Sequence, residues 1–161
     1  MLCAMVLEGC DPLSSPCVLR LHASLAATEL ERGCAGALRR TGVLISGSTY
    51  VPPGPLGLGP LLEGGCAFLK EEIENPAERA FAAFLFFSSS QFFSDINKRT
   101  ASLALNGILL SQGCLPFVFD SAGEGLFADL LVRFYETGNA NPFMECFEAR
   151  SRELWRAQPH Q

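Results

Sequence analysis

Histidine and clustered basic residues are both scarce in this sequence, and their scarcity excludes two kinds of site. Only two histidines, His22 and His160, occur in 161 residues, so the spacing of a histidine-containing zinc site is absent. The 12 lysines and arginines form no basic run, and the net charge is −5. We therefore expect no nucleic-acid partner, because phosphate contacts need clustered positive charge.

Long hydrophobic runs are missing as well. The most apolar run, Phe81–Phe87, is far shorter than the roughly 20 residues that a membrane-spanning helix needs. The N-terminal residues lack the positive charge and the long apolar run of a signal peptide. We therefore expect no membrane partner.

The seven cysteines do not form a recognisable framework. Their number is odd, none belongs to a C-x-x-C pair, and several lie inside apolar runs. This pattern is typical of reduced, mostly buried thiols, and it predicts a cytoplasmic protein with no metal site of its own.

Apolar residues make up 48% of the chain and charged residues 18%, which predicts a folded domain with one core. Apolar spacing and breaker residues predict a mostly α fold with one small β-hairpin at Val43–Val51. A Gly- and Pro-rich loop is expected at Gly54–Gly65. The expected helices cover residues 17–40, 66–75, 76–87, 97–112, 125–137 and 142–157.

The segment Gln91–Ser102 carries the strongest chemical signal. A carboxylate, an amide, an ammonium and a guanidinium occur together just where a long helix is expected to begin. Free backbone N–H groups at a helix start attract anions, and two cations suit a polyphosphate. An ordinary helix start with solvated charges is the alternative, because such mixtures of residues are common at helix starts. The four residues are Asp95, Asn97, Lys98 and Arg99.

This segment resembles the signature of the Fic/Doc family, His-Pro-Phe-x-Asp/Glu-Gly-Asn-Gly/Lys-Arg-x-x-Arg. Phe93, Asp95, Asn97 and Arg99 match it, and Lys98 matches the variant of Doc-like members. The resemblance implies a Fic-fold helical bundle that binds ATP with Mg, in which Asp95 holds the magnesium ion through the nucleotide.

Two further segments support the resemblance. Gly36 to Arg39 and then Val43–Pro53 are similar to the family's Gly-x-x-Arg and to the hairpin, called the flap, that pins a target protein. Arg39 is expected to anchor the flap by an ion pair. We expect one domain over residues 17–157 after an N-terminal segment, residues 1–16. The flap residues expected to dock the target are Ile45, Ser46, Gly47, Ser48, Thr49 and Tyr50.

The chain departs from the signature at three positions. Gln91 stands where the family has its catalytic histidine, and an amide does not accept a proton near neutral pH. Ile96 replaces a glycine and Ser102 replaces the second arginine. His22 is predicted to be a packed or capping residue on its helix rather than a substitute base.

The N-terminal segment offers a related clue. Ala4 to Gly9 is similar to the family's inhibitory helix, whose glutamate corresponds to Glu8. Because Ser102 replaces the arginine with which that glutamate pairs, Glu8 is expected to have lost its partner. A short helical turn without regulatory function is the alternative.

The resemblance implies a protein adenylyltransferase, which transfers AMP from ATP to a target hydroxyl, with weak or altered activity because of Gln91. One alternative is a non-catalytic module that docks a partner strand on the flap. Another is a Doc-like phosphotransferase, which only Lys98 favours. A homodimer is also compatible with the sequence.

Overall fold

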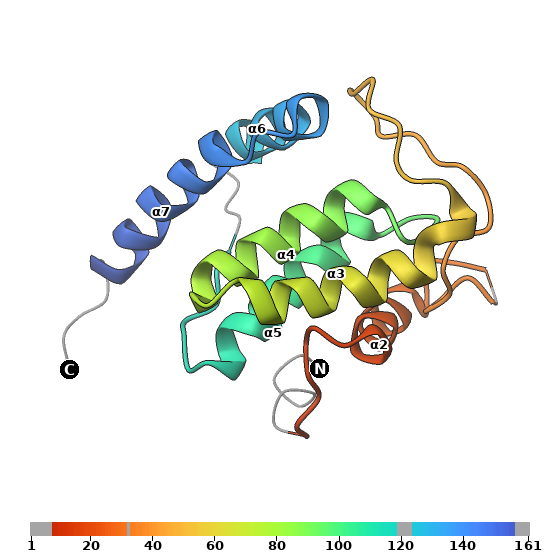
Figure 1. Ribbon diagram of the computed structural model, residues 1–161, viewed down its shortest axis with the longest axis horizontal. Coiled ribbons are helices and arrows are strands. Elements are labelled where there is room, and N and C mark those ends of the chain that lie inside the picture. Colours follow the sequence, from red (N-terminus) through yellow and green to blue (C-terminus); the bar gives the residue numbers. More distant parts are fainter. Residues whose placement is uncertain (1–7, 32, 119–123, 157–161) are drawn as a thin grey trace. The chain divides into compact units, whose positions relative to one another are not determined.

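The computed structural model describes residues 8–31, 33–118 and 124–156 (Figure 1). These residues form two compact units. The larger unit contains the residues up to Ile45 together with Val51–Pro116. The smaller unit contains Ser46–Tyr50 and the residues from Phe117 onward. The predicted domain over residues 17–157 stays a prediction.

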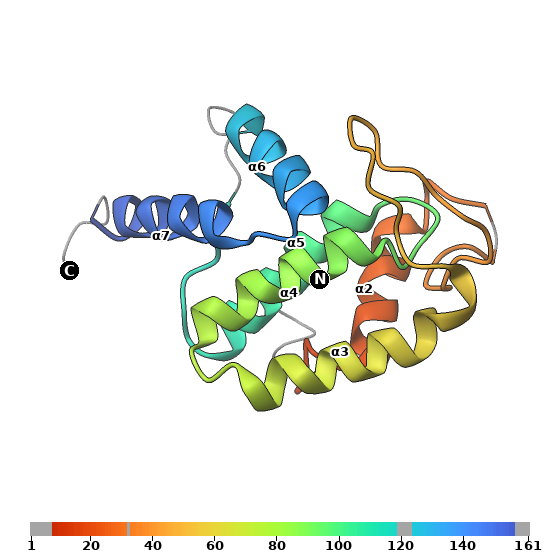
Figure 2. The same cartoon turned by 45° about the horizontal axis from the view of Figure 1, so that its top comes forward.

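The larger unit is a helical bundle built around two antiparallel neighbours. Helix α4 packs most extensively against α5, α3 contacts α4, and α2 contacts both α5 and α3 (Figure 2). This arrangement confirms the predicted mostly α fold. The elements of this unit are α2 (Ser15–Ala26), η1 (Pro55–Gly57), α3 (Leu58–Glu72), α4 (Pro76–Ser90) and α5 (Asn97–Ser111).

Helix α4 is the central buried helix that its apolar composition predicts. The side chain of Asn75 accepts hydrogen bonds from the amides of Ala77 and Glu78, and Pro76 occupies the first turn. Proline is tolerated at this position because the N–H group that it lacks would have no acceptor within the helix. The helix is covered on more than one face, and it is therefore apolar on more than one face. Its buried residues include Phe81, Ala83, Phe84, Leu85 and Phe87.

Helix α3 corrects the prediction of a loop at Gly54–Gly65. Pro60 is tolerated because it falls in the first helical turn, where the N–H groups have no acceptor within the helix. Gly65 lies in the helix interior, where a Cβ atom would come within 2.1 Å of the Phe86 ring of α4. This glycine therefore permits close packing of α3 on α4 and does not mark a flexible segment.

Helix α2 is shorter than predicted, because it ends at Ala26 and not at Arg40. Gly33 and Gly36 both have positive φ angles, which a helix does not accept. A Cβ atom on Gly36 would lie 2.9 Å from the Cβ of Ala23 and 3.0 Å from the carbonyl oxygen of Leu19. The chain therefore turns back and packs closely against α2.

Helix α5 ends at Ser111, within one residue of the predicted end at 112, and Gly113 follows its C-cap. This residue has a φ of 70°, and its amide donates to the carbonyl of Leu110. The amide of Cys114 donates to the carbonyl of Leu109. These two bonds form a Schellman motif, which satisfies carbonyl groups at the helix end.

The predicted β-hairpin is not seen, since no strand occurs in the described part of the chain. A turn forms at Ser46 and Gly47, as expected, between two segments without regular secondary structure. Side chains take the amides that a hairpin would pair: the hydroxyl of Ser48 accepts from the Tyr50 amide, and Glu136 accepts from the Thr49 amide. Local side-chain bonds of this kind compete with strand pairing.

The smaller unit consists of α6 (Glu124–Thr137) and α7 (Asn141–Arg156), which contact each other, together with Ser46–Tyr50. Its core is aromatic. The ring centroids of Phe117 and Phe147 are 4.0 Å apart, and Phe127 lies 5.8 Å from Phe143. Both helices confirm the predicted ones to within one residue at each end.

Across the described ranges, no helix is long and apolar enough to cross a membrane.

Candidate functional site

The six residues Gln91–Ile96, called here the signature loop, join α4 to α5. Gln91 has a φ of 47° and Ile96 a φ of 64°, and among the described residues they are the only non-glycine residues with positive φ. Each costs of order 1–3 kcal/mol relative to an ordinary backbone conformation. The surrounding contacts therefore hold the loop in a strained shape at both of its ends.

The side chain of Gln91 is bonded at both of its polar atoms. Its Nε2 donates to the carbonyl of Ser88 at 2.7 Å, and its Oε1 accepts from Nδ2 of Asn97 at 3.0 Å. Gln91 therefore links the last turn of α4 to the first residue of α5. An amide in this arrangement supplies no proton acceptor for catalysis.

Asn97 closes the loop from the other side. Its Oδ1 accepts from the Phe93 amide and its Nδ2 donates to the Phe93 carbonyl, both at 2.9 Å. Asn97 is only 7% exposed, so these bonds are shielded from water. The structure places this predicted phosphate-binding residue as a brace of the loop backbone.

Two buried phenylalanines hold the loop against the bundle. Phe92 packs edge-on against Phe86 and Phe87 of α4, with ring centroids 5.4 and 6.1 Å away. Phe93 stacks on the His22 ring of α2, with centroids 3.7 Å apart and planes inclined by 4°. The loop is therefore fixed to both α4 and α2.

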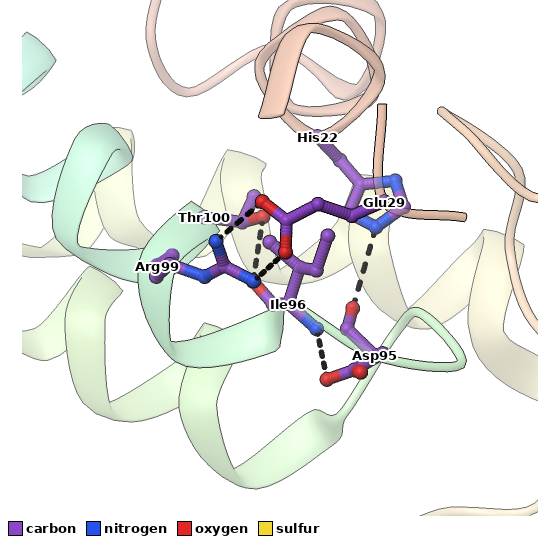
Figure 3. A network of polar contacts seen from close by, with 6 residues as sticks. All are labelled: His22, Glu29, Asp95, Ile96, Arg99 and Thr100. Atoms are coloured by element: carbon purple, nitrogen blue, oxygen red, sulfur yellow. Dashed lines mark hydrogen bonds and ion pairs between the residues drawn. The ribbon is translucent and has the colours of Figure 1, made fainter. Parts of the chain in front are cut away.

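His22 bonds to two separate segments, one at each ring nitrogen (Figure 3 shows the bond to the loop). Nδ1 accepts from the Gly36 amide at 2.9 Å, and Nε2 lies 3.3 Å from the carbonyl oxygen of Asp95. Burial lowers the pKa of His22, while the bond to Asp95 and the charge of that residue act in the opposite direction. The prediction of a packed, non-catalytic histidine agrees with this environment.

Asp95 and Ile96 form the entry to α5. The Asp95 side chain is exposed, and its Oδ1 accepts from the Ile96 amide at 2.6 Å. Ile96 is 4% exposed, and its carbonyl accepts from both the amide and the hydroxyl of Thr100 at 3.0 Å (Figure 3). Ile96 therefore keeps a backbone conformation that usually favours glycine.

The two cations of the segment differ in their partners. Arg99 forms a two-pronged ion pair with Glu29, with both N–O distances at 2.7 Å (Figure 3). Its hydrogen bond to Arg99 lowers the pKa of Glu29. Lys98 is exposed, and its side chain has no partner within the described chain. Lys98 is thus free to meet an anion, whereas Arg99 must first leave Glu29.

Arg39 joins the loop to the base of the flap. Its backbone amide donates to the Phe92 carbonyl, and its guanidinium donates to the carbonyls of Gln91, Thr41 and Pro53. Burial lowers its pKa. The predicted ion pair is wrong, because the guanidinium bonds to backbone carbonyls; the predicted anchoring of the flap agrees with these contacts.

The tip of the flap is held within the smaller unit. Tyr50 stacks on Tyr135 of α6, with ring centroids 5.9 Å apart. The Glu136 carboxylate accepts from the Thr49 amide at 3.4 Å and from the Ser48 hydroxyl at 3.5 Å. Ile45, Ser46 and Gly47 complete the segment predicted to dock a target, and that role stays a prediction.

Residues 1–7 of the predicted inhibitory segment lie outside the described residues. Glu8 is described, and its carboxylate lies 3.6 Å from the guanidinium of Arg20, with both side chains more than half exposed. The partner of Glu8 is therefore on α2 and not on α5. The inhibitory role of Glu8 stays a prediction.

Sequence reasoning missed two residues beside the signature loop. Glu29 was placed inside a helix, although it lies beyond the end of α2 and pairs with Arg99. The contact of His22 with Asp95 was also missed. A lone histidine among apolar residues is the signal that could have directed attention to it, but the sequence does not indicate its partner. In the part of the chain that the structure describes, no cluster of His, Cys, Asp or Glu is suited to a metal ion.

Comparison with known proteins identifies the family. A solved structure, Fic-1 (residues 134–508) from C. elegans, is similar with a TM-score of 0.78 and 25% identity. The match covers 94% of this chain and 44% of that one, so this chain spans less than half of its length. No curated protein sequence matches. The Fic/DOC family model matches residues 12–109, more than half of the chain, and the chain therefore belongs to the Fic/DOC family.

Proposed function

We propose that the chain binds a nucleoside triphosphate such as ATP with Mg at the start of α5, and that it transfers AMP to a target hydroxyl only slowly. The retained strain of the signature loop carries this proposal. Gln91 and Ile96 hold left-handed conformations that side chains disfavour. A loop held in such a conformation at two non-glycine residues points to a function for its shape.

The start of α5 offers the chemistry of a phosphate site. The amides of Asn97, Lys98 and Arg99 occupy the first turn, where they have no acceptor within the helix. The positive end of the helix dipole and the free ammonium of Lys98 add to the attraction of an anion. Arg99 contributes once its pair with Glu29 opens.

The donor set also fits a magnesium ion that arrives with the nucleotide. Only Oδ1 of Asp95 is engaged in the described structure, so Oδ2 of this exposed carboxylate is available. Magnesium prefers one or two carboxylates together with phosphate oxygens and water. Bound there, the ion would neutralise phosphate charge, and Asp95 would be its protein ligand.

Slow transfer follows from the lack of a proton-accepting side chain at position 91, where the family signature has histidine. Gln91 is an amide with both polar atoms engaged, and His22 is fully buried. Removal of a positioned base lowers a rate by typically 10²–10⁴-fold. Binding of the nucleotide does not need this base.

A non-catalytic docking module is the second candidate. Leu44 and Val51, on either side of the flap turn, are 87% and 75% exposed. Exposed apolar side chains on an extended segment suit the addition of a partner strand. This function needs the flap and not the phosphate site.

Calorimetric titration with ATP and magnesium tests the proposed function. We expect saturable binding that Lys98→Ala weakens, while Arg133→Ala, which removes an exposed positive charge in the smaller unit, leaves it unchanged. No heat and no thermal shift at millimolar nucleotide would leave only the docking module.

Incubation with labelled ATP and candidate target proteins tests transfer. We expect Gln91→His to raise the labelling above the level of the natural sequence, because it supplies the missing base. A variant that binds nucleotide but labels no more than the natural chain would contradict the account of slow transfer.

A further inference from the structure

The side chain of His22 contacts two separate segments of the site. It lies on α2 and is 0% exposed. One ring nitrogen bonds to Gly36 at the start of the segment that leads to Arg39, and the other bonds to Asp95 in the signature loop. Its ring face stacks on Phe93 of the same loop. A residue needed only to fill the core does not require both polar contacts.

The two bonds define the protonation state of the ring. The Gly36 amide is a donor, so Nδ1 must be the acceptor and carries no proton. In the neutral ring the proton is therefore on Nε2, which donates it to the Asp95 carbonyl. In the other tautomer the proton would be on Nδ1. Two donors would then face each other at Gly36, and two acceptors would face each other at Asp95.

We propose that His22 is a positioning residue of the nucleotide site, and that it sets the orientation of Asp95 through the Nε2–H bond to the Asp95 carbonyl. The inference rests on the proposed function. The carbonyl and the carboxylate belong to the same residue, and the next residue, Ile96, is strained. A fixed carbonyl fixes the peptide plane between Asp95 and Ile96, and with it the Ile96 amide that binds Oδ1 of the Asp95 carboxylate.

The bond to Gly36 has a different role. Gly36 has a φ of 72°, and the chain passes so close to α2 there that a Cβ atom would meet Ala23. The Nδ1 bond satisfies the amide of this turn and supports the fold. Nδ1 therefore makes a structural contact and Nε2 makes the positioning contact. Because the two contacts use different atoms, each can be removed without the other.

Substitution of His22 by asparagine or by glutamine removes one of the two contacts and can keep the other. The side-chain oxygen of His22→Asn can replace Nδ1 as the acceptor for Gly36, but it leaves the Asp95 carbonyl without a donor. The side-chain nitrogen of His22→Gln can replace Nε2 as the donor to Asp95, but it leaves the Gly36 amide without an acceptor. Both variants lose the stack on Phe93, so they are matched in that respect.

The affinity for ATP with magnesium is measured for both variants together with their melting temperatures. We expect His22→Asn to bind about three- to tenfold more weakly than His22→Gln, the effect of one buried hydrogen bond. Equal affinities would overturn the inference, as would weaker binding by His22→Gln. A natural chain that binds no nucleotide would instead refute the proposed function, so the two failures are distinguishable.

Nitrogen NMR of the natural ring tests the inference without a core substitution. His160 is replaced by glutamine to leave one histidine signal. We expect the shifts of a neutral ring protonated at Nε2, with a slowly exchanging proton whose resonance moves when ATP and magnesium are added. A ring protonated at Nδ1, or a resonance that does not move while calorimetry detects binding, would overturn the proposal.

Discussion

Arg39 contacts both the signature loop and the base of the flap, yet the loop and the flap are held in different ways. The loop is fixed by buried groups: Phe92, Phe93 and Asn97 are all less than 10% exposed. The tip of the flap is held by exposed bonds of 3.4 and 3.5 Å to Glu136 and by one aromatic stack. Buried bonds cost more to break than exposed ones. Substitutions that remove the contacts of the loop should therefore cost more stability than substitutions in the flap.

Asn97→Ala should have the largest effect on this comparison. It removes the bonds to Phe93 and Gln91 and leaves the buried Phe93 amide without an acceptor. We expect a loss of about 2–4 kcal/mol in the free energy of unfolding, measured with urea. Ser102→Ala, which removes only a bond to Lys98 within the helix, is the control and should cost about 0.5 kcal/mol or less. An equal, small effect of both variants would show that the loop is no more rigid than the helix surface.

Arg39→Met should affect the flap more than the helices that flank the signature loop. The substitution keeps a buried apolar stem but removes the donors to Gln91, Thr41 and Pro53. We expect a loss of about 2 kcal/mol and faster hydrogen exchange at residues 41–53, while α4 and α5 stay protected. Arg40→Met, at an exposed neighbouring position, should leave exchange unchanged. Unaltered exchange in both variants would mean that the base of the flap does not depend on Arg39.

Glu29→Gln sharpens the account of the loop as a phosphate site. It removes the charge that engages Arg99, so the guanidinium becomes available to phosphate. We expect about two- to fivefold tighter binding of ATP with magnesium by calorimetry, with a nearly unchanged melting temperature, because the pair is exposed. Glu31→Gln removes a nearby exposed charge and is the control. Weaker binding by Glu29→Gln would indicate that the ion pair supports the site instead of competing for it.

Glu136→Gln should have the smallest effect. It weakens the acceptor for the Thr49 amide and the Ser48 hydroxyl without removing the stack of Tyr50 on Tyr135. We expect a stability change within about 0.5 kcal/mol and a modest rise in proteolysis between residues 46 and 50. Glu145→Gln, an exposed substitution on α7, should not change the cleavage pattern. A large loss of stability would place the tip of the flap in the core of the smaller unit.

Much of the fold could be predicted from local sequence signals. Apolar spacing located α4, α6 and α7, and it placed the end of α5 within one residue of Ser111. The family was also predicted from the resemblance of Phe93, Asp95, Asn97 and Arg99 to its signature, and the family model confirms it. These signals are local or fixed in spacing, so one sequence is enough to detect them.

The errors have a common origin in contacts between distant residues. The Gly- and Pro-rich composition of Gly54–Gly65 predicted a loop, but packing against Phe86 makes glycine favourable at position 65 inside α3. The β-rich segment at Val43–Val51 predicted a hairpin, but Ser48 and Glu136 take its amides. Propensity is a weak guide wherever tertiary contacts decide how a backbone group is satisfied.

The sequence by itself determined which chemical groups the site has: Asp95, Lys98 and Arg99 are present, and Gln91 has no titratable proton acceptor. Only the tertiary structure decided what each group is free to do. It pairs Arg99 with Glu29, uses Asn97 and Gln91 as braces, and places His22 between Gly36 and Asp95. The physical reason is that a hydrogen-bonding group can serve a ligand only if the fold has not already engaged it, and its partners here are up to 73 residues away in the chain.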